Sequence, residues 1–141
     1  MNVEASINSY IAALPEPKQG DITTLNTRIL QLLPNCKLWF FDGKDPNGKV
    51  VTNPQIGFGQ QTKLYADGKT KAFYQVGISA NTVGISVYIM GIEDKTYLPN
   101  TYGEKIGKAS VTGYCIKFKN VKDINLKVLD EAILDGVKQT S

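Results

Sequence analysis

The N-terminal part of the chain contains two segments in which apolar residues recur every three or four positions. The first covers residues 3–14 and is followed by Pro15 and Pro17, which end it because proline lacks the amide proton that a helix interior needs. The second covers residues 18–33 and ends before Pro34. This spacing predicts two short amphipathic helices, each with an apolar face that must pack against the rest of the fold.

From residue 36 onward, apolar positions alternate with polar or small ones, which is typical of strands. Four such runs follow, at residues 36–41, 55–66, 70–80 and 83–89, and an Asp-Gly turn joins the second run to the third. Tight links between consecutive strands favour an antiparallel meander. The alternation places one set of residues of the third run on a shared, core-facing side: Ala72, Tyr74, Val76 and Ile78.

The C-terminal part predicts a short helix, one more strand and a final helix. The short helix is expected to start near Pro99 and to end at Gly107, and the strand covers residues 114–119. Asn125 is a residue type that caps helix N-termini, so the last helix is expected to begin directly after it. Its buried stripe consists of Leu126, Leu129, Ile133 and Val137.

The resulting order, α-α-β-β-β-β-α-β-α, predicts a single α+β domain over residues 1–141. We expect a twisted, mainly antiparallel sheet, with the two N-terminal helices and the C-terminal helix packed on one face. A chain of 141 residues is long enough to bury a core of this kind.

The composition excludes several kinds of chemistry. The chain has no histidine, which excludes a Ser-His-Asp triad, a Cys-His nucleophile pair and an HExxH zinc helix. Its two cysteines, Cys36 and Cys115, form no CxxC pair, so we expect no metal site and no cofactor held by them. Cys36 is predicted to be a small core residue, and Cys115, on a strand with lysines, is the better candidate for a reactive thiol.

The sequence also bears on where the protein works. The N-terminus lacks the basic and apolar regions of a signal peptide, and no apolar run is long enough to span a bilayer. Two isolated thiols are typical of a reducing compartment. We therefore expect a cytoplasmic protein with no membrane partner.

Positive charge is concentrated in two parts of the chain. The net charge is +3, whereas residues 37–71 carry six lysines against three aspartates and residues 95–122 carry six lysines against one glutamate. Such segments attract anions or nucleic acid, or they form a solvated lysine face. Because Arg28 is the one arginine and base recognition favours arginine, the sequence disfavours a nucleic-acid partner.

A glycine motif and the acidic residues have structural explanations. Gly57-Phe58-Gly59 lies within a strand pattern and is not followed by a helix, so it does not fit a phosphate-binding loop. Glycine inside a strand instead predicts a bulge or the close approach of another backbone. The carboxylate pairs fall in turns or on the polar side of the last helix, where turn, capping and solvation roles are expected.

One group of residues suggests a binding surface. By alternation, the sheet face turned away from the helices carries aromatic, lysine and serine side chains from several strands: Trp39, Lys63, Tyr65, Lys71, Phe73, Ser86, Tyr88, Lys117 and Lys119. Rings interleaved with lysines on an open sheet face can stack on a flat anionic ligand; the alternative is that they only cover the sheet. The candidate ligand-binding residues are Trp39, Lys63, Tyr65, Phe73, Tyr88 and Lys117.

The order of short motifs resembles the YdhG-like family of small bacterial domains. The matching segments cover nearly the whole chain: Ile56-Gly57-Phe58-Gly59, Tyr65-Ala66-Asp67-Gly68, Val76-Gly77-Ile78-Ser79, Ser86-Val87-Tyr88-Ile89-Met90, Gly107-Lys108, Gly113-Tyr114-Cys115-Ile116 and 123–129. The resemblance implies an α+β fold and no established general activity. One branch of the family is described as a frataxin-like iron chaperone.

The chain departs from that family's pattern at two places. Residues 60–63 stand where relatives often carry a histidine, and residues 80–82 stand where many have a Pro-Arg-Lys turn. No acidic ridge matches that of the iron-chaperone branch. The leading hypothesis is therefore a non-catalytic protein that binds a small-molecule ligand on its open sheet face, and the alternative is intracellular iron delivery through surface carboxylates.

Overall fold

A computed structural model describes residues 2–141 of the chain. The helices are α1 (Val3–Ala13), α2 (Lys18–Leu32), α3 (Tyr97–Tyr102) and α4 (Leu126–Thr140), with a short 3-10 helix, η1, at Val121–Asp123. The strands are β1 (Leu38–Phe41), β2 (Gln55–Phe58), β3 (Gln61–Leu64), β4 (Thr70–Phe73), β5 (Val76–Ala80), β6 (Ile85–Ile89), β7 (Ser110–Val111) and β8 (Cys115–Phe118).

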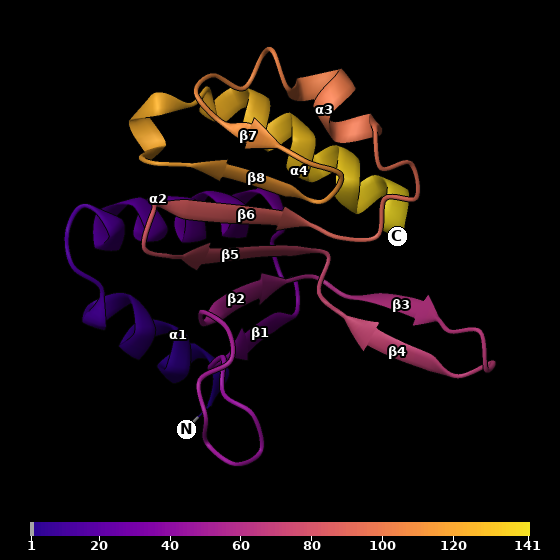
Figure 1. The fold of residues 1–141 in the computed structure, drawn as a ribbon, viewed down its shortest axis with the longest axis horizontal. Coiled ribbons are helices and arrows are strands. Elements are labelled where there is room, and N and C mark those ends of the chain that lie inside the picture. Colours follow the sequence, from indigo (N-terminus) through magenta and orange to yellow (C-terminus); the bar gives the residue numbers. More distant parts are fainter. Residues whose placement is uncertain (1) are drawn as a thin grey trace.

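Six strands form an antiparallel sheet in the order β1-β2-β5-β6-β8-β7, and β3 and β4 form a separate hairpin (Figure 1). Figure 1 shows the hairpin projecting from the sheet and the helices α1, α2 and α4 lying behind it, so that the opposite face stays open. This arrangement confirms the predicted α+β fold with a mainly antiparallel sheet. No helix within residues 2–141 combines the length and apolar character needed to cross a membrane.

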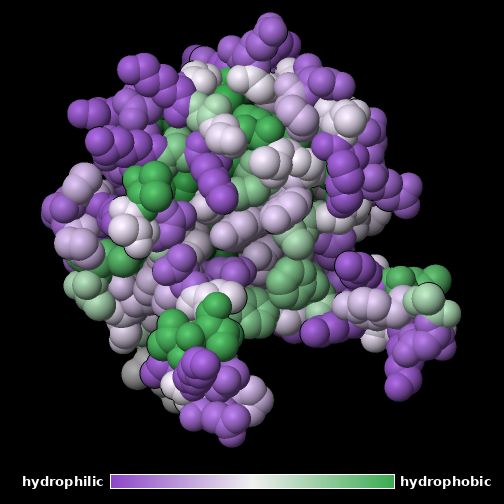
Figure 2. All heavy atoms as spheres, viewed as in Figure 1, coloured by the Kyte–Doolittle hydropathy of each residue, from purple (hydrophilic) through white to green (hydrophobic). Residues whose placement is uncertain are grey.

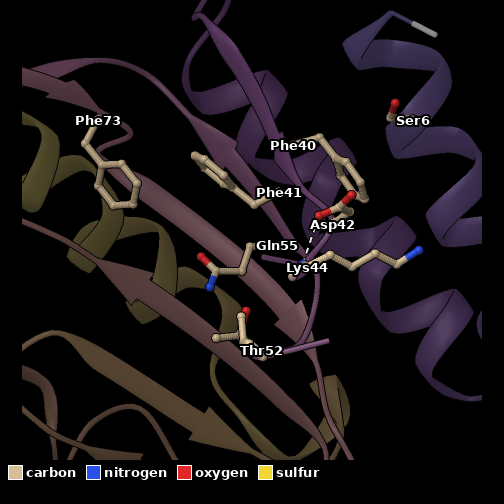
Figure 3. Close-up of a pocket in the computed structure, with 10 residues that line it drawn as sticks. Ser6, Phe40, Phe41, Asp42, Lys44, Thr52, Gln55 and Phe73 are labelled. Carbon is tan, nitrogen blue, oxygen red and sulfur yellow. Dashed lines mark hydrogen bonds between the residues drawn. The ribbon is translucent and has the colours of Figure 1, made fainter. Parts of the chain in front are cut away.

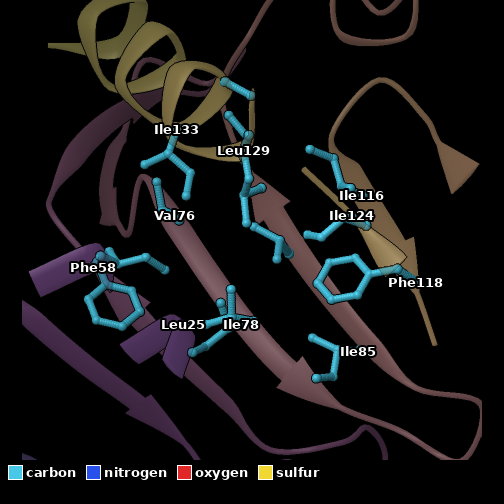
Figure 4. Packing of buried hydrophobic residues seen from close by; sticks show 14 of the residues in the cluster. Leu25, Phe58, Val76, Ile78, Ile85, Ile116, Phe118, Ile124, Leu129 and Ile133 are labelled. Atoms are coloured by element: carbon cyan, nitrogen blue, oxygen red, sulfur yellow. The ribbon is translucent and has the colours of Figure 1, made fainter. Parts of the chain in front are cut away.

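The core lies between the sheet and the helices. Ile22, Leu25 and Ile29 of α2 are fully buried, as is Leu129 of α4 (Figure 4). They pack against alternate residues of β2, β5, β6 and β8: Ile56, Phe58, Val76, Ile78, Ile85, Val87, Ile89, Ile116 and Phe118. Burial of this apolar stripe on each helix is the main term that holds the layers together.

The two longest helices are also joined by an ion pair. Arg28 on α2 donates two hydrogen bonds to Asp130 on α4, from Nε to Oδ1 at 2.7 Å and from a terminal nitrogen to Oδ2 at 2.8 Å. Both side chains are partly exposed, at 32% and 22%. This two-pronged contact fixes the relative position of α2 and α4 at the rim of the core.

Helix ends were predicted with mixed success. Asn125 caps α4 as predicted, because its Oδ1 accepts hydrogen bonds from the amides of Lys127 and Val128. The end of the short helix at Gly107 is wrong: α3 stops at Tyr102. The chain turns there because Ile106 enters the core, and Gly107, at a φ of 104°, then pairs with Ile124.

The prediction of one continuous strand at 55–66 and another at 70–80 is also wrong. Each run contributes one strand to the main sheet and one to the hairpin, and the chain changes direction at Gly59, which has a φ of 79°. A side chain at Gly59 would collide with the amide of Gln75. The base of the hairpin is held by Gln61, whose Nε2 donates to the carbonyls of Tyr74 and Met90, both at 3.0 Å.

Candidate functional site

Four aromatic side chains meet on the open face of the sheet, and we call them the aromatic cluster: Trp39, Phe41, Phe73 and Tyr74. The Phe73 and Tyr74 rings stack with centroids 4.1 Å apart, and Phe41 lies 5.7 Å from Phe73. Trp39 lies 6.1 Å from Phe41 and 6.3 Å from Phe73. Tyr74 is 2% exposed, whereas the other three are half-buried, so the cluster presents ring surface to solvent.

Two glycines explain why Tyr74 can lie against the sheet. Gly57 on β2 pairs directly with Gly77 on β5. A Cβ atom at Gly57 would lie 2.5 Å from Cδ2 of Tyr74, and one at Gly77 would lie 2.6 Å from its Cζ. The tyrosine ring therefore occupies the space that two side chains would otherwise fill, so a side chain approaches Gly57 and not the backbone that the strand glycine predicts.

The position of Tyr74 corrects a further prediction. The alternation put Tyr74 on the core side with Val76 and Ile78, but only the latter two belong to the core. The backbone passes from the hairpin to the main sheet between Phe73 and Val76, and this change of direction moves the Tyr74 ring to the open face. A period of two applies only within one uninterrupted strand.

The hydroxyl of Tyr74 is fixed by Gln55. It donates a hydrogen bond of 2.7 Å to Oε1 of Gln55, the first residue of β2. Burial raises the pKa of the Tyr74 phenol, so the hydroxyl keeps its proton and acts as a donor at neutral pH. Gln55 is half-buried beside the aromatic cluster, and its amide orientation follows from this contact.

An open hollow of about 610 Å³ lies where the segment 42–54 meets the sheet. Figure 3 shows Phe41, Phe73 and Gln55 on one side of this hollow and Asp42 and Lys44 on the other. Its lining is completed by Ser6, Phe40, Gly43, Val51 and Thr52. Figure 2 shows this face of the molecule, with projections that correspond to the 42–54 segment and to the β3–β4 hairpin of Figure 1.

The 42–54 segment is held in shape by backbone-directed contacts. Oδ1 of Asp45 accepts hydrogen bonds of 2.9 Å from the amides of Asn47 and Lys49. The carbonyl of Gly43 accepts from the amides of Val51 and Thr52 at 2.8 and 3.1 Å. These bonds give the wall of the hollow a defined backbone, although most of its side chains are exposed.

Lysines surround the aromatic cluster. Nζ of Lys37 lies 4.5 Å from the centre of the Trp39 ring, a cation–π distance. Lys63 on β3 lies opposite Lys71 on β4 in the hairpin. Lys71 and Phe73 are two residues apart on β4 and therefore lie on the same face of the hairpin. Within residues 2–141 none of these lysines forms an ion pair. Positive charge therefore lies beside the aromatic cluster and on the hairpin, whereas Lys44 and Asp42 offset each other in the lining of the hollow.

The six residues expected to bind a ligand fall into three places. Trp39 and Phe73 meet in the aromatic cluster. Lys63 and Tyr65 lie on the hairpin, outside the main sheet, with Nζ of Lys63 5.5 Å from the Tyr65 ring.

Tyr88 and Lys117 lie farther along the open face, on β6 and β8. Tyr88 stacks on Tyr114, with ring centroids 6.5 Å apart. Lys117 borders a second open groove, of about 540 Å³, together with Lys108 and Lys119. The structure thus keeps the predicted open face but divides its aromatic and lysine residues among separate positions.

The sequence reasoning missed Phe41, Gln55 and Tyr74. Phe41 has the same parity as Trp39 in the first strand, so the alternation already contained the signal for it. The contact between Gln55 and Tyr74 left no signal, because it depends on the paired glycines and on the turn of the chain at the hairpin base.

Neither cysteine has the surroundings of a reactive thiol. Cys115 is 2% exposed and burial raises its pKa, so the expectation that it is the more reactive thiol is wrong. Cys36 is half-buried against the core, as predicted, and burial raises its pKa as well. Both thiols are free.

One acidic site lies away from the hollow. Asp135 on α4 accepts hydrogen bonds from the hydroxyls of Tyr97 and Tyr102 on α3, and from Gln139 at 3.0 Å. Burial opposes ionisation of Asp135, but these hydrogen bonds and the charge of Lys138 outweigh it and lower the pKa. The contacts join α3 to α4. Within the described part of the chain no group of three or more cysteine or acidic side chains could hold a metal ion.

Comparisons of the chain with protein-family models, with curated proteins and with solved structures found no match.

Proposed function

We propose that this protein is a non-catalytic member of the YdhG-like family that binds a small planar ligand in the hollow beside the aromatic cluster. The observation that carries the proposal is the half-buried pair Phe41 and Phe73, whose rings form one wall of a hollow of about 610 Å³. Pockets for small molecules commonly have volumes of about 300–1,000 Å³.

The wall is suited to stacking. Phe73 stacks on Tyr74, which is itself fixed against Gly57 and Gly77, so its ring is supported on one side while the side chain stays half-exposed. A supported ring loses little entropy when a second ring stacks on it, and aromatic stacking contributes about 1 kcal/mol beyond area burial. A planar ligand gains most from such a surface.

The opposite wall provides polar groups. Asp42, Lys44 and Thr52 come from the 42–54 segment, and Gln55 lies at the sheet side. The lining is evenly mixed, and polar groups placed beside aromatic surface can fix the orientation of a bound ligand. Asp42 already accepts a hydrogen bond from the Lys44 amide at 2.9 Å, which suits a role in shaping the turn rather than in acid–base catalysis.

Family membership is part of the proposal because the motif order from Ile56 to Leu129 resembles that family, and the observed α+β fold fits it. Two free thiols fit a cytoplasmic location.

Ligand-observed NMR with a set of planar aromatic compounds tests the proposal. We expect binding by the wild-type protein and at least a fivefold weaker affinity for Phe73→Ala, about 1 kcal/mol, because the stacking partner is lost. Val83→Ala is the control, since Val83 is 82% exposed in the turn between β5 and β6, does not line the hollow and should leave affinity unchanged. Absence of binding by every compound, or equal binding by Phe73→Ala, contradicts the proposed function.

A further inference from the structure

We infer that the hollow selects planar ligands that carry a carboxylate, and that the side-chain amide of Gln55 is the group that recognises it. This inference rests on the proposed function and deepens it by naming the class of ligand. Three observations support it: the hydrogen bond between Tyr74 and Gln55, the amide N–H groups that this bond leaves free, and the lysines near the aromatic cluster.

The first step is the orientation of the Gln55 amide. Tyr74 is nearly fully buried, and its ring is confined by Gly57, Gly77 and Phe73. Its hydroxyl therefore has little freedom, and it donates to Oε1 of Gln55 at 2.7 Å. Since that oxygen is the acceptor, the amide nitrogen of Gln55 occupies the other position and carries two N–H groups.

The second step is that these donors are available. Within residues 2–141, Nε2 of Gln55 donates to no other group, although Gln55 is half-buried and lines the hollow. This nitrogen is accessible to solvent, so an acceptor on a ligand replaces water there and contributes the net gain of an exchanged hydrogen bond. The group that completes the site is therefore a hydrogen-bond acceptor next to a flat apolar body.

The third step is the sign of the charge. Lys44 lines the hollow, and Nζ of Lys37 lies over the Trp39 ring. Lys71 precedes Phe73 by two residues on β4 and lies on the same face of that strand. None of them is neutralised by an ion pair within the described residues. The one carboxylate in the lining, Asp42, accepts a hydrogen bond from the Lys44 amide and offsets the charge of Lys44, so the excess positive charge comes from Lys37 and Lys71. An anionic acceptor, a carboxylate, is favoured over a neutral one.

The experiment compares two ligands of the same shape, 2-naphthoate and 2-naphthamide, by NMR titration of the full chain. We expect 2-naphthoate to bind about tenfold more tightly than 2-naphthamide, the usual gain of a charge-assisted hydrogen bond. In Gln55→Glu the donors are replaced by a negative charge, so 2-naphthoate affinity should fall about tenfold while 2-naphthamide affinity changes less than about twofold.

Two further variants separate recognition from folding. Tyr74→Phe keeps the ring but removes the hydroxyl that orients the amide, and it should reduce the preference for 2-naphthoate without abolishing binding of 2-naphthamide. Lys117→Ala removes a lysine from the second groove and should change neither affinity. Thermal unfolding of each variant reports whether the fold is intact.

The outcomes distinguish the two proposals. Equal affinity for both ligands, or a preference for 2-naphthoate that survives in Gln55→Glu, overturns the assignment of a carboxylate to Gln55 and leaves the proposed function standing. If neither 2-naphthoate nor 2-naphthamide binds, the inference and the proposed function are both overturned. A tenfold preference for 2-naphthoate that is lost in Gln55→Glu and kept in Lys117→Ala supports the inference.

Discussion

The ring of Tyr74 lies against the backbone of Gly77, so closely that a Cβ atom on this glycine would be 2.6 Å from Cζ and 2.8 Å from the hydroxyl oxygen of the tyrosine. The glycine is therefore required for the ring to reach the open face. The same ring supports Phe73 and orients Gln55, so the local geometry of the hollow depends on this contact.

Gly77→Ala should destabilise the protein by about 1–3 kcal/mol, because the added methyl group overpacks a rigid site. Denaturant unfolding measures the change. Gly20→Ala is the matched control: its Cβ would meet only the flexible end of Glu16 at 3.2 Å, and alanine stabilises the helix α2 by about 0.5–1 kcal/mol. If Gly77→Ala unfolds at the wild-type denaturant concentration, the ring does not occupy this space.

The ion pair between Arg28 and Asp130 should contribute about 1 kcal/mol, at the upper end for partly exposed pairs because both of its hydrogen bonds are short. Arg28→Met should therefore lower the free energy of unfolding by that amount. The loss should shrink at about 1 M salt, where charges are screened. Lys127→Met, at an exposed lysine of α4, should have little effect at either salt concentration. If the loss of unfolding free energy in Arg28→Met does not depend on salt, Arg28 stabilises the protein through packing and not through its charge.

The fold was predictable from the sequence where one face of an element is apolar throughout. The apolar stripes of α2 and α4 allow one orientation of each helix, and the alternation in β5 and β6 allows one register. Any other orientation or register would expose the core residues. The boundaries of the hairpin were not predictable in this way. Gly59 and Gln61 redirect the chain through a positive φ and through hydrogen bonds to distant carbonyls, neither of which changes the alternation of residue types.

The same limit applies to the candidate site. Trp39 and Phe73 meet on the open face as predicted; parity within β1 explains Trp39, whereas Phe73 arrives there although its predicted strand breaks before Val76. Lys63 and Tyr65 were grouped with them because the strand was taken to continue past Gly59, whereas they belong to the hairpin. The hollow itself depends on the 42–54 segment, whose turn residues predict a loop but not its position over the sheet.

Asp135 should make part of the stability depend on pH. Its pKa is lowered in the folded protein, so its contribution is present above the pKa of about 3.9 of an unfolded aspartate and is lost as the pH falls through the folded value. Asp135→Asn should cost about 1–2 kcal/mol at neutral pH, where two tyrosine hydroxyls donate to the carboxylate, and the difference from wild type should shrink in acid. Unfolding curves across acidic and neutral pH measure this, and a difference that stays constant would contradict the role of the charge.

Asp45 should control the shape of the 42–54 segment. In Asp45→Ala the amides of Asn47 and Lys49 lose their acceptor, so their hydrogen exchange should accelerate about tenfold and 2-naphthoate should bind more weakly. Asp67→Ala removes a similar turn contact, to Lys69 at 2.9 Å, from the hairpin and serves as the control. Unchanged 2-naphthoate affinity in Asp45→Ala would show that this segment does not form a wall of the ligand site.

¹H–¹⁵N chemical shifts, mapped during titration with 2-naphthoate and with 2-naphthamide, test whether the hollow beside the aromatic cluster is the ligand site. Trp39 is the single tryptophan, so its indole N–H, which donates to the Gly59 carbonyl at 2.7 Å, gives one resonance at the edge of the site. We expect saturable chemical-shift changes that are largest at this indole and at the amides of Phe41, Gln55 and Phe73. Absence of saturable shifts with both compounds, or shifts centred on the groove around Lys117, would contradict this expectation.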